Sequence, residues 1–133
     1  MISKELWLKR VVDVIAQIAD PVFQEKAWIQ GKTFLSISLS ETACQLYDDC
    51  QFELFLEEFA QKKYLPEDLL AELREFHKVL DAYLDEHGTC DLVEAFILKD
   101  PEWHNIQKKA QRLIENFKKL GIQPIDLENI RWI

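Results

Sequence analysis

Apolar side chains recur every three or four residues along most of this chain, which is the period of an amphipathic α-helix. The clearest stripes lie in three segments: near the N-terminus, after Pro66 and after Pro101. Their members are Trp7, Val11, Val14 and Ile18; Leu69, Leu73, Phe76, Leu80 and Tyr83; and Trp103, Ile106, Ala110, Leu113, Phe117 and Leu120. Stripes of this width on successive helices predict a helical bundle.

Capping residues and glycines divide the chain into five or six predicted helices. A short polar side chain before a helix accepts the free N–H groups of the first turn, and glycine adopts the left-handed conformation that ends a helix. We expect starts at Ser3, Asp20, Ser40, Pro66 and Asp100, and ends at Gly31, Gly88 and Gly121. The region from Ser40 to about residue 64 should break near Asp48 and Asp49, and a short helix should cover residues 91–98.

One segment departs from the helical period. In TFLSISLS, residues 33–40, apolar residues alternate with serines, and a period of two is typical of extended chain. No strong second strand accompanies it, although the C-terminal IDLENIRWI could pair with it. The sequence therefore predicts an all-α fold: a single domain over residues 1–133, with one short extended segment near 33–39.

Charge changes this picture more than composition does. The 133 residues carry a net charge of −8, and residues 41–72 alone hold nine acidic and two basic side chains. Binding to nucleic acid depends on neutralised phosphates, so this balance argues against a nucleic-acid partner. It favours a protein partner with a basic surface. The alternative is that the acidic residues only keep the protein soluble.

The cysteines and apolar runs bear on location. Cys44, Cys50 and Cys90 are odd in number and form no CxxC pair, so we expect free thiols in a reducing compartment. Charged residues interrupt the N-terminal apolar run, and no uncharged stretch approaches the length of a membrane span. The expectation is a cytoplasmic protein without a membrane segment.

Local spacing offers no catalytic or metal motif. Cys44 and Cys50 lie on different sides of a regular helix, and no Glu-x-x-His pair or glycine-rich phosphate loop occurs. His77 falls at the edge of an apolar face and is expected in the core. We therefore predict no cofactor, no metal and no enzymatic activity. An enzyme built from cysteines and histidines that meet in space remains a less favoured alternative.

The stretch CQLYDDCQFELFLEEF, residues 44–59, holds the candidate binding residues. Phe52, Phe55, Leu56 and Phe59 form a helical stripe that we expect in the core. The remaining aromatic and acidic residues would form a docking surface, with the tyrosine as anchor and the carboxylates steering a basic partner. These predicted partner-binding residues are Tyr47, Asp48, Asp49, Glu53, Glu57 and Glu58. An ordinary solvated face is the alternative.

The order of several segments resembles small acidic helical immunity proteins of bacteria. The segments are FQEKAWIQGK, the serine-rich connection, SETACQLYDDC, FLEEF, LLAELREFHKVLDAYLDE and DPEWHNI. This resemblance implies a cytoplasmic inhibitor that binds and occludes a toxin encoded beside it, often a nuclease, and it implies no catalytic residues. A second hypothesis is a structural or adaptor protein that forms a homodimer through Trp103, Trp132 and the apolar IRWI tail. The sequence thus leaves monomer and homodimer both open.

Overall fold

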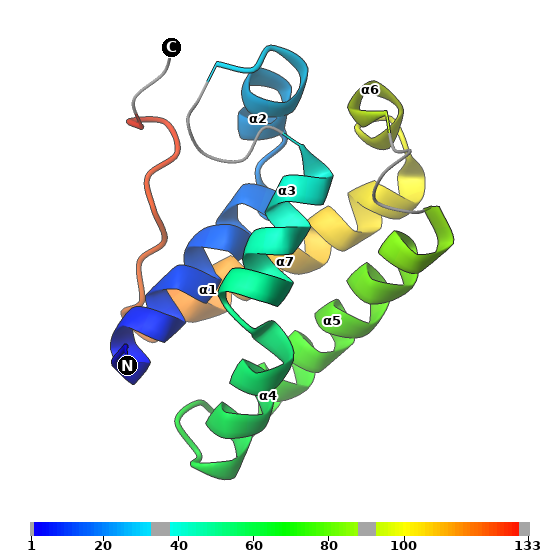
Figure 1. The fold of residues 1–133 in the computed structure, drawn as a ribbon. Helices are drawn as coiled ribbons and strands as arrows, with labels where there is room; N and C mark the ends of the chain where they lie inside the picture. Colours follow the sequence, from blue (N-terminus) through cyan, green and yellow to red (C-terminus); the bar gives the residue numbers. More distant parts are fainter. Residues whose placement is uncertain (1, 33–37, 88–92, 131–133) are drawn as a thin grey trace.

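The computed structural model describes residues 2–32, 38–87 and 93–130 (Figure 1). Within these ranges the chain forms seven α-helices, two π-helical segments and no strand. In chain order they are α1 (Lys4–Ala19), α2 (Pro21–Gln24), η1 (Glu25–Ile29), α3 (Leu39–Cys44), η2 (Gln45–Asp49), α4 (Phe52–Gln61), α5 (Glu67–His87), α6 (Glu94–Ile97) and α7 (Pro101–Lys119). The all-α prediction is confirmed, and the number of helices is close to the five or six expected.

The three long helices form the frame of the bundle. α7 packs against α1 along one side and against α5 along the other, while α4 packs on α5 (Figure 1). The predicted stripes of α1, α5 and α7 supply much of one continuous hydrophobic core. Its largest fully buried side chains are Trp103, Phe23, Phe52, Phe55, Phe59, Phe76 and Phe117.

Three of the predicted helix starts have the capping geometry expected of them. The side-chain oxygens of Ser3, Asp20 and Asp100 accept hydrogen bonds from first-turn N–H groups at 3.0–3.1 Å. The predicted cap at Ser40 is wrong, because Ser38 caps α3 instead and accepts the N–H of Glu41 at 3.0 Å. Leu39, predicted to be extended, is therefore the first helical residue. Residues 33–37 of the predicted extended segment, and the predicted end at Gly88, lie outside the described residues.

Left-handed backbone ends several elements. Gly31 and Gly121 have φ of 63° and 80°, as expected of glycines that close a helix. Gln51 and Lys63 also adopt positive φ, at 49° and 56°, and they bracket α4. The break expected near Asp48 and Asp49 thus falls two residues later, at Gln51, because the chain continues as the π-helical η2 through Asp49.

A buried amide joins α2 to both neighbouring helices. The Gln24 amide nitrogen donates to the carbonyls of Gln17 and Ile18 at 2.8 and 2.7 Å, in the last turn of α1. Its amide oxygen accepts from Trp103 Nε1 at 3.1 Å and from Gln107 Nε2 at 2.8 Å, both on α7. Two carbonyls in the last turn of α1 thereby accept hydrogen bonds inside the core.

The C-terminal segment after α7 returns along α1 (Figure 1). The Ile125 N–H donates to Asp13 Oδ1 at 2.8 Å, and Leu127 is buried. In its described part, up to residue 130, the segment forms no strand. It covers one side of α1 as irregular chain.

Candidate functional site

The phenylalanine stripe of α4 fixes how the predicted docking residues are presented. Phe52, Phe55, Leu56 and Phe59 are all buried, as expected. Trp7 of α1 makes edge-to-face contacts with Phe55 and Phe59, at ring-centroid distances of 5.7 and 5.6 Å. With the stripe inward, the acidic residues of the helix must lie on its outer surface.

The acidic residues divide between the two flanks of α4. Glu53 and Glu57 lie one turn apart on one flank, and Leu54 and Glu58 lie one turn apart on the other. Asp48, Asp49, Glu53 and Glu57 are exposed, and no ion pair in the described part of the chain involves them. Glu58 is half-buried and bonded to Lys62 at 3.2 Å. Four of the five predicted carboxylates therefore make no ion pair with the residues that the structure describes.

Tyr47 is held within the fold more than the sequence suggested. Its hydroxyl lies 2.9 Å from His77 Nδ1, and its ring packs edge-to-face on Phe52. Burial raises the pKa of the Tyr47 hydroxyl well above its usual range, and the carboxylates of Asp81 and Glu53 add to the effect. The hydroxyl is thus engaged by His77, and only the partly exposed part of the ring is left for a partner to contact.

Asp81 extends the acidic surface onto α5. It lies one turn after His77, is exposed, and is close enough to Tyr47 to influence its pKa. Sequence spacing alone does not connect Asp81 to residues 47–58. Its spacing of four from His77 would have revealed the connection only if the Tyr47–His77 contact had been known.

On the other flank of α4 lies a groove that the sequence did not reveal. It has a volume of about 620 Å³ and runs between the start of α1 and α4. Ile2, Leu54 and Tyr64 line it with 42%, 44% and 39% of their surfaces exposed. Asp49 and Glu58 lie at the same groove, where Lys4 Nζ stands 4.1 Å from the centre of the Tyr64 ring. Apolar side chains and carboxylates thus share one concave surface.

The thiols show no sign of an activated nucleophile in the described residues. Cys50 is buried, and burial, with a smaller contribution from Asp49, raises the pKa of its thiol to about 11. A thiol with such a pKa is protonated at neutral pH and reacts slowly. Cys44 is exposed and Cys50 is buried, so the two face different sides as predicted. Cys90 lies outside the described residues.

The histidines occupy three different environments. His77 is half-buried against Tyr47 and Phe52, close to the core position expected for it. His104 is exposed, and its Nε2 lies 2.7 Å from the carbonyl of Leu98. His87, in the last turn of α5, faces Glu102 of α7 at 3.5 Å. No described histidine lies next to a described cysteine, serine or threonine side chain in a hydrogen bond.

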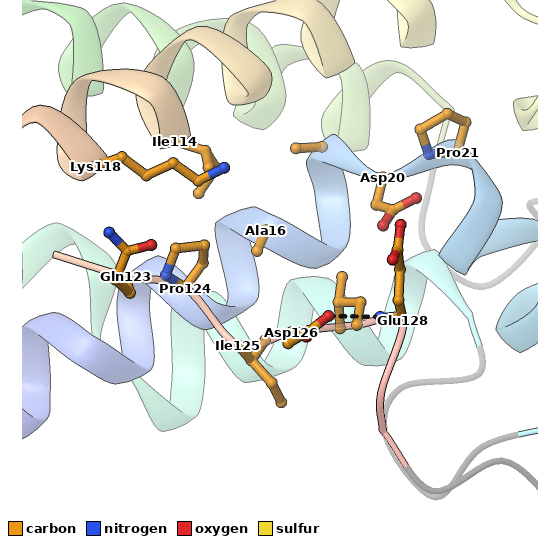
Figure 2. Close-up of a pocket in the computed structure, with 12 residues that line it drawn as sticks. Ala16, Asp20, Pro21, Ile114, Lys118, Gln123, Pro124, Ile125, Asp126 and Glu128 are labelled. Atoms are coloured by element: carbon orange, nitrogen blue, oxygen red, sulfur yellow. Dashed lines mark hydrogen bonds between the residues drawn. The ribbon is translucent and has the colours of Figure 1, made fainter.

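A second concavity lies under the C-terminal segment (Figure 2). It has a volume of about 470 Å³, and its walls carry no hydroxyl, thiol or imidazole group. Lys118 lies on one side, and the carboxylates of Asp20 and Glu128 lie on the other (Figure 2). Asp126 Oδ1 accepts the N–H of Glu128 at 3.1 Å, which shapes the turn of the segment. The pocket therefore lacks the hydroxyl or thiol nucleophile and the imidazole base of Ser–His and Cys–His catalysis.

No known protein family, no curated protein and no solved structure matches the chain. Among the described residues, none of the helices combines the length and the apolarity needed to cross a bilayer.

Proposed function

We propose that this chain is a non-enzymatic protein-binding domain, and that it acts as an immunity-type inhibitor covering a basic surface of a toxin. The observation that carries the proposal is an apolar groove on one flank of α4 together with exposed carboxylates on η2 and on the other flank, which make no ion pair among the described residues. Stable interfaces have an apolar centre surrounded by a polar rim. Leu54, Tyr64 and Ile2 supply such a centre, and Asp49 supplies part of the rim beside Lys4 and Lys62.

Charge supports a basic partner in particular. Exposed carboxylates without an internal cation raise the encounter rate with a positively charged protein, and this effect weakens with salt. Such carboxylates also repel one another within the fold, at a cost of a few tenths of a kcal/mol for a pair one turn apart. Glu53 and Glu57, which lie one turn apart on α4, are such a pair. The positive charge of a basic partner would attract both carboxylates and offset this repulsion.

The resemblance to immunity proteins is the reason for proposing a toxin as the basic partner. It rests on the order of segments from Phe23 to Tyr83, and α4 and η2 lie within that part of the chain. The discriminating genetic observation is the neighbouring reading frame. A large secreted protein with a variable C-terminal domain directly upstream favours an immunity function, and a metabolic operon contradicts it.

A charge reversal tests the position of the docking surface. Asp48→Lys with Asp49→Lys should abolish binding to the basic product of the neighbouring frame, since both residues are exposed and form no ion pair with a described residue. The matched control is Glu75→Lys with Asp85→Lys, which makes the same change of charge on exposed positions of α5. Equal on-rates and affinities for the two double variants would show that the surface is misplaced.

A homodimer is the second candidate, and the residues that favour it differ from those expected from the sequence. Trp103 is fully buried against Trp28 and Tyr83, so it cannot contribute to a dimer interface as the sequence suggested. Trp132 lies outside the described residues. The observation that favours a dimer is instead the exposure of Val93 and Phe96, at 64% and 62%, on and beside α6. A monomer by sedimentation at micromolar concentration would contradict this candidate.

A further inference from the structure

The end of α5 meets the start of α7 in a cluster of three potential metal ligands. Glu86 and His87 belong to the last turn of α5, and Glu102 to the first turn of α7. One ligand atom from each lies within 4.8 Å of the other two. The set is chemically mixed, with one imidazole nitrogen and two carboxylates, and it comes from two helices separated by a connection.

The imidazole of His87, whose side chain is 25% exposed, provides a second observation. Its Nε2 is inaccessible to solvent and makes no hydrogen bond with any described residue, and the nearest carboxylate oxygen, on Glu102, is 3.5 Å away. Buried polar atoms in proteins are nearly always partnered. An imidazole nitrogen that lies 3.5 Å from a carboxylate oxygen and makes no close hydrogen bond is the arrangement expected where a cation is the missing partner.

Neighbouring groups hold the His87 ring in place. Tyr83 packs against it at a centroid distance of 4.4 Å, and the Tyr83 hydroxyl donates to Asp100 Oδ2 at 2.8 Å. Asp100 also caps α7 through the N–H of Glu102 at 3.0 Å, so it positions the helix turn that carries Glu102. Outer contacts of this kind orient the ligands of metal sites.

The location also suits a cation. The carboxyl end of the 21-residue α5 carries partial negative charge, which favours cations in its last turn. A groove of about 210 Å³ opens beside the cluster, with Glu86, Glu102 and Asn105 among its lining residues. Glu102 is 61% exposed, which leaves its carboxylate free to move toward an ion.

We propose that Glu86, His87 and Glu102 form a binding site for a divalent transition-metal ion of the zinc type. Three protein ligands would leave a fourth position to water, as in open zinc sites. Imidazole with carboxylates favours zinc-type ions over magnesium or calcium, which prefer oxygen alone. The bound ion would join the end of α5 to the start of α7. This inference is independent of the proposed docking function.

Calorimetric titration of the full chain with zinc chloride tests the site. We expect one ion per chain, with the affinity reduced at least about tenfold by either His87→Gln or Glu102→Gln. Glu102→Gln alters an exposed side chain and should leave the fold intact. The control is His104→Gln, which removes an exposed imidazole two residues away and should bind zinc like the parent protein.

Cobalt absorption separates this site from binding by cysteine. Cobalt held by one imidazole and carboxylates should show no intense thiolate-to-metal band near the ultraviolet, whereas a cysteine-bound ion would. Zinc should also raise the melting temperature of the parent protein and of His104→Gln, but not that of Glu102→Gln, because a ligand of the folded state alone stabilises it. Unchanged zinc affinity in both ligand variants, an intense thiolate band, or no stoichiometric binding would overturn the proposal.

Discussion

Two polar regions of this molecule differ in whether their side chains are bonded inside the fold or exposed to solvent. Around Gln24, every donor and acceptor of the side chain is used inside the fold, by carbonyls of α1 and by side chains of α7. On η2 and α4, Asp48, Asp49, Glu53 and Glu57 are exposed and lack an ion-pair partner among the described residues. The first region is explained by the stability of the fold. The second makes no ion pair within the described chain, and this difference underlies our proposal that it binds a partner.

The largest expected effect is at the buried amide. Gln24→Ala removes the buried amide that accepts from Trp103 Nε1 and donates to two carbonyls of α1, so we expect a loss of about 3 kcal/mol in the free energy of unfolding. Urea denaturation followed by circular dichroism measures it. Gln61→Ala, at an exposed position, is the control and should change stability by less than about 0.5 kcal/mol. If Gln24→Ala lowered the free energy of unfolding no more than Gln61→Ala does, the buried amide would not stabilise the fold as we expect.

The same contrast should appear in the thiols that flank η2. In a Cys90→Ser variant at pH 8, iodoacetamide should modify Cys44 at least about 100-fold faster than Cys50. Cys44 is exposed, whereas Cys50 is buried and has its thiol pKa raised to about 11. Mass spectrometry of digested protein gives the two rates. Comparable rates would show that the segment around Cys50 opens in the native state.

Because folding favours the protonated thiol of Cys50, pH should affect stability in one direction. The unfolded thiol loses its proton near the ordinary pKa of 9.0, while the folded thiol keeps it to about 11. The contribution is therefore present below pH 9 and is lost as the pH rises toward 11. Cys50→Ala should flatten this part of the stability profile, and an unchanged slope would contradict the assignment.

An intermediate effect on stability is expected at Tyr47, which is half-buried and has one hydrogen-bond partner among the described residues. Tyr47→Phe removes the hydroxyl that meets His77 Nδ1 at 2.9 Å and keeps the ring against Phe52. We expect a loss of about 1 kcal/mol in the free energy of unfolding, measured by the same urea titration. No loss would mean that the Tyr47 hydroxyl has a solvent partner of equal strength and is available to a binding partner.

The smallest effect on stability is expected at the acidic surface itself. Asp48→Asn with Asp49→Asn should change the free energy of unfolding by less than about 0.5 kcal/mol, since both side chains are exposed and unpaired. A loss above about 1 kcal/mol in urea would show that these carboxylates stabilise the fold. In that case their exposure would no longer argue for binding.

Local chemistry made much of the fold predictable. The stripes of α5 and α7, the caps at Ser3, Asp20 and Asp100 and the glycine at 121 all act within a few residues of one another. Choosing Ser40 over Ser38 failed because two serines two residues apart have the same capping chemistry. The break at Gln51 was missed because a glutamine gives no signal of left-handed backbone.

The site depended on contacts that sequence spacing does not encode. The predicted carboxylates are exposed as expected, but their division between two flanks follows from which side of α4 faces α1. The groove needs Ile2 and Leu54, which are 52 positions apart, and the Tyr47 contact needs His77, 30 residues away. Glu102 likewise comes to His87 only when α7 packs on α5. Long-range packing, rather than any motif, assembles these surfaces.

The most direct test of the docking surface is the salt dependence of association with the purified product of the neighbouring reading frame, measured by surface plasmon resonance. We expect tight 1:1 binding whose on-rate falls at least about tenfold between 50 and 500 mM salt, because the carboxylates steer a basic partner. Asp48→Lys with Asp49→Lys should lose this binding, while Glu75→Lys with Asp85→Lys should largely keep it. A salt-independent on-rate, or identical behaviour of the two double variants, would contradict a docking function for the acidic surface of η2 and α4.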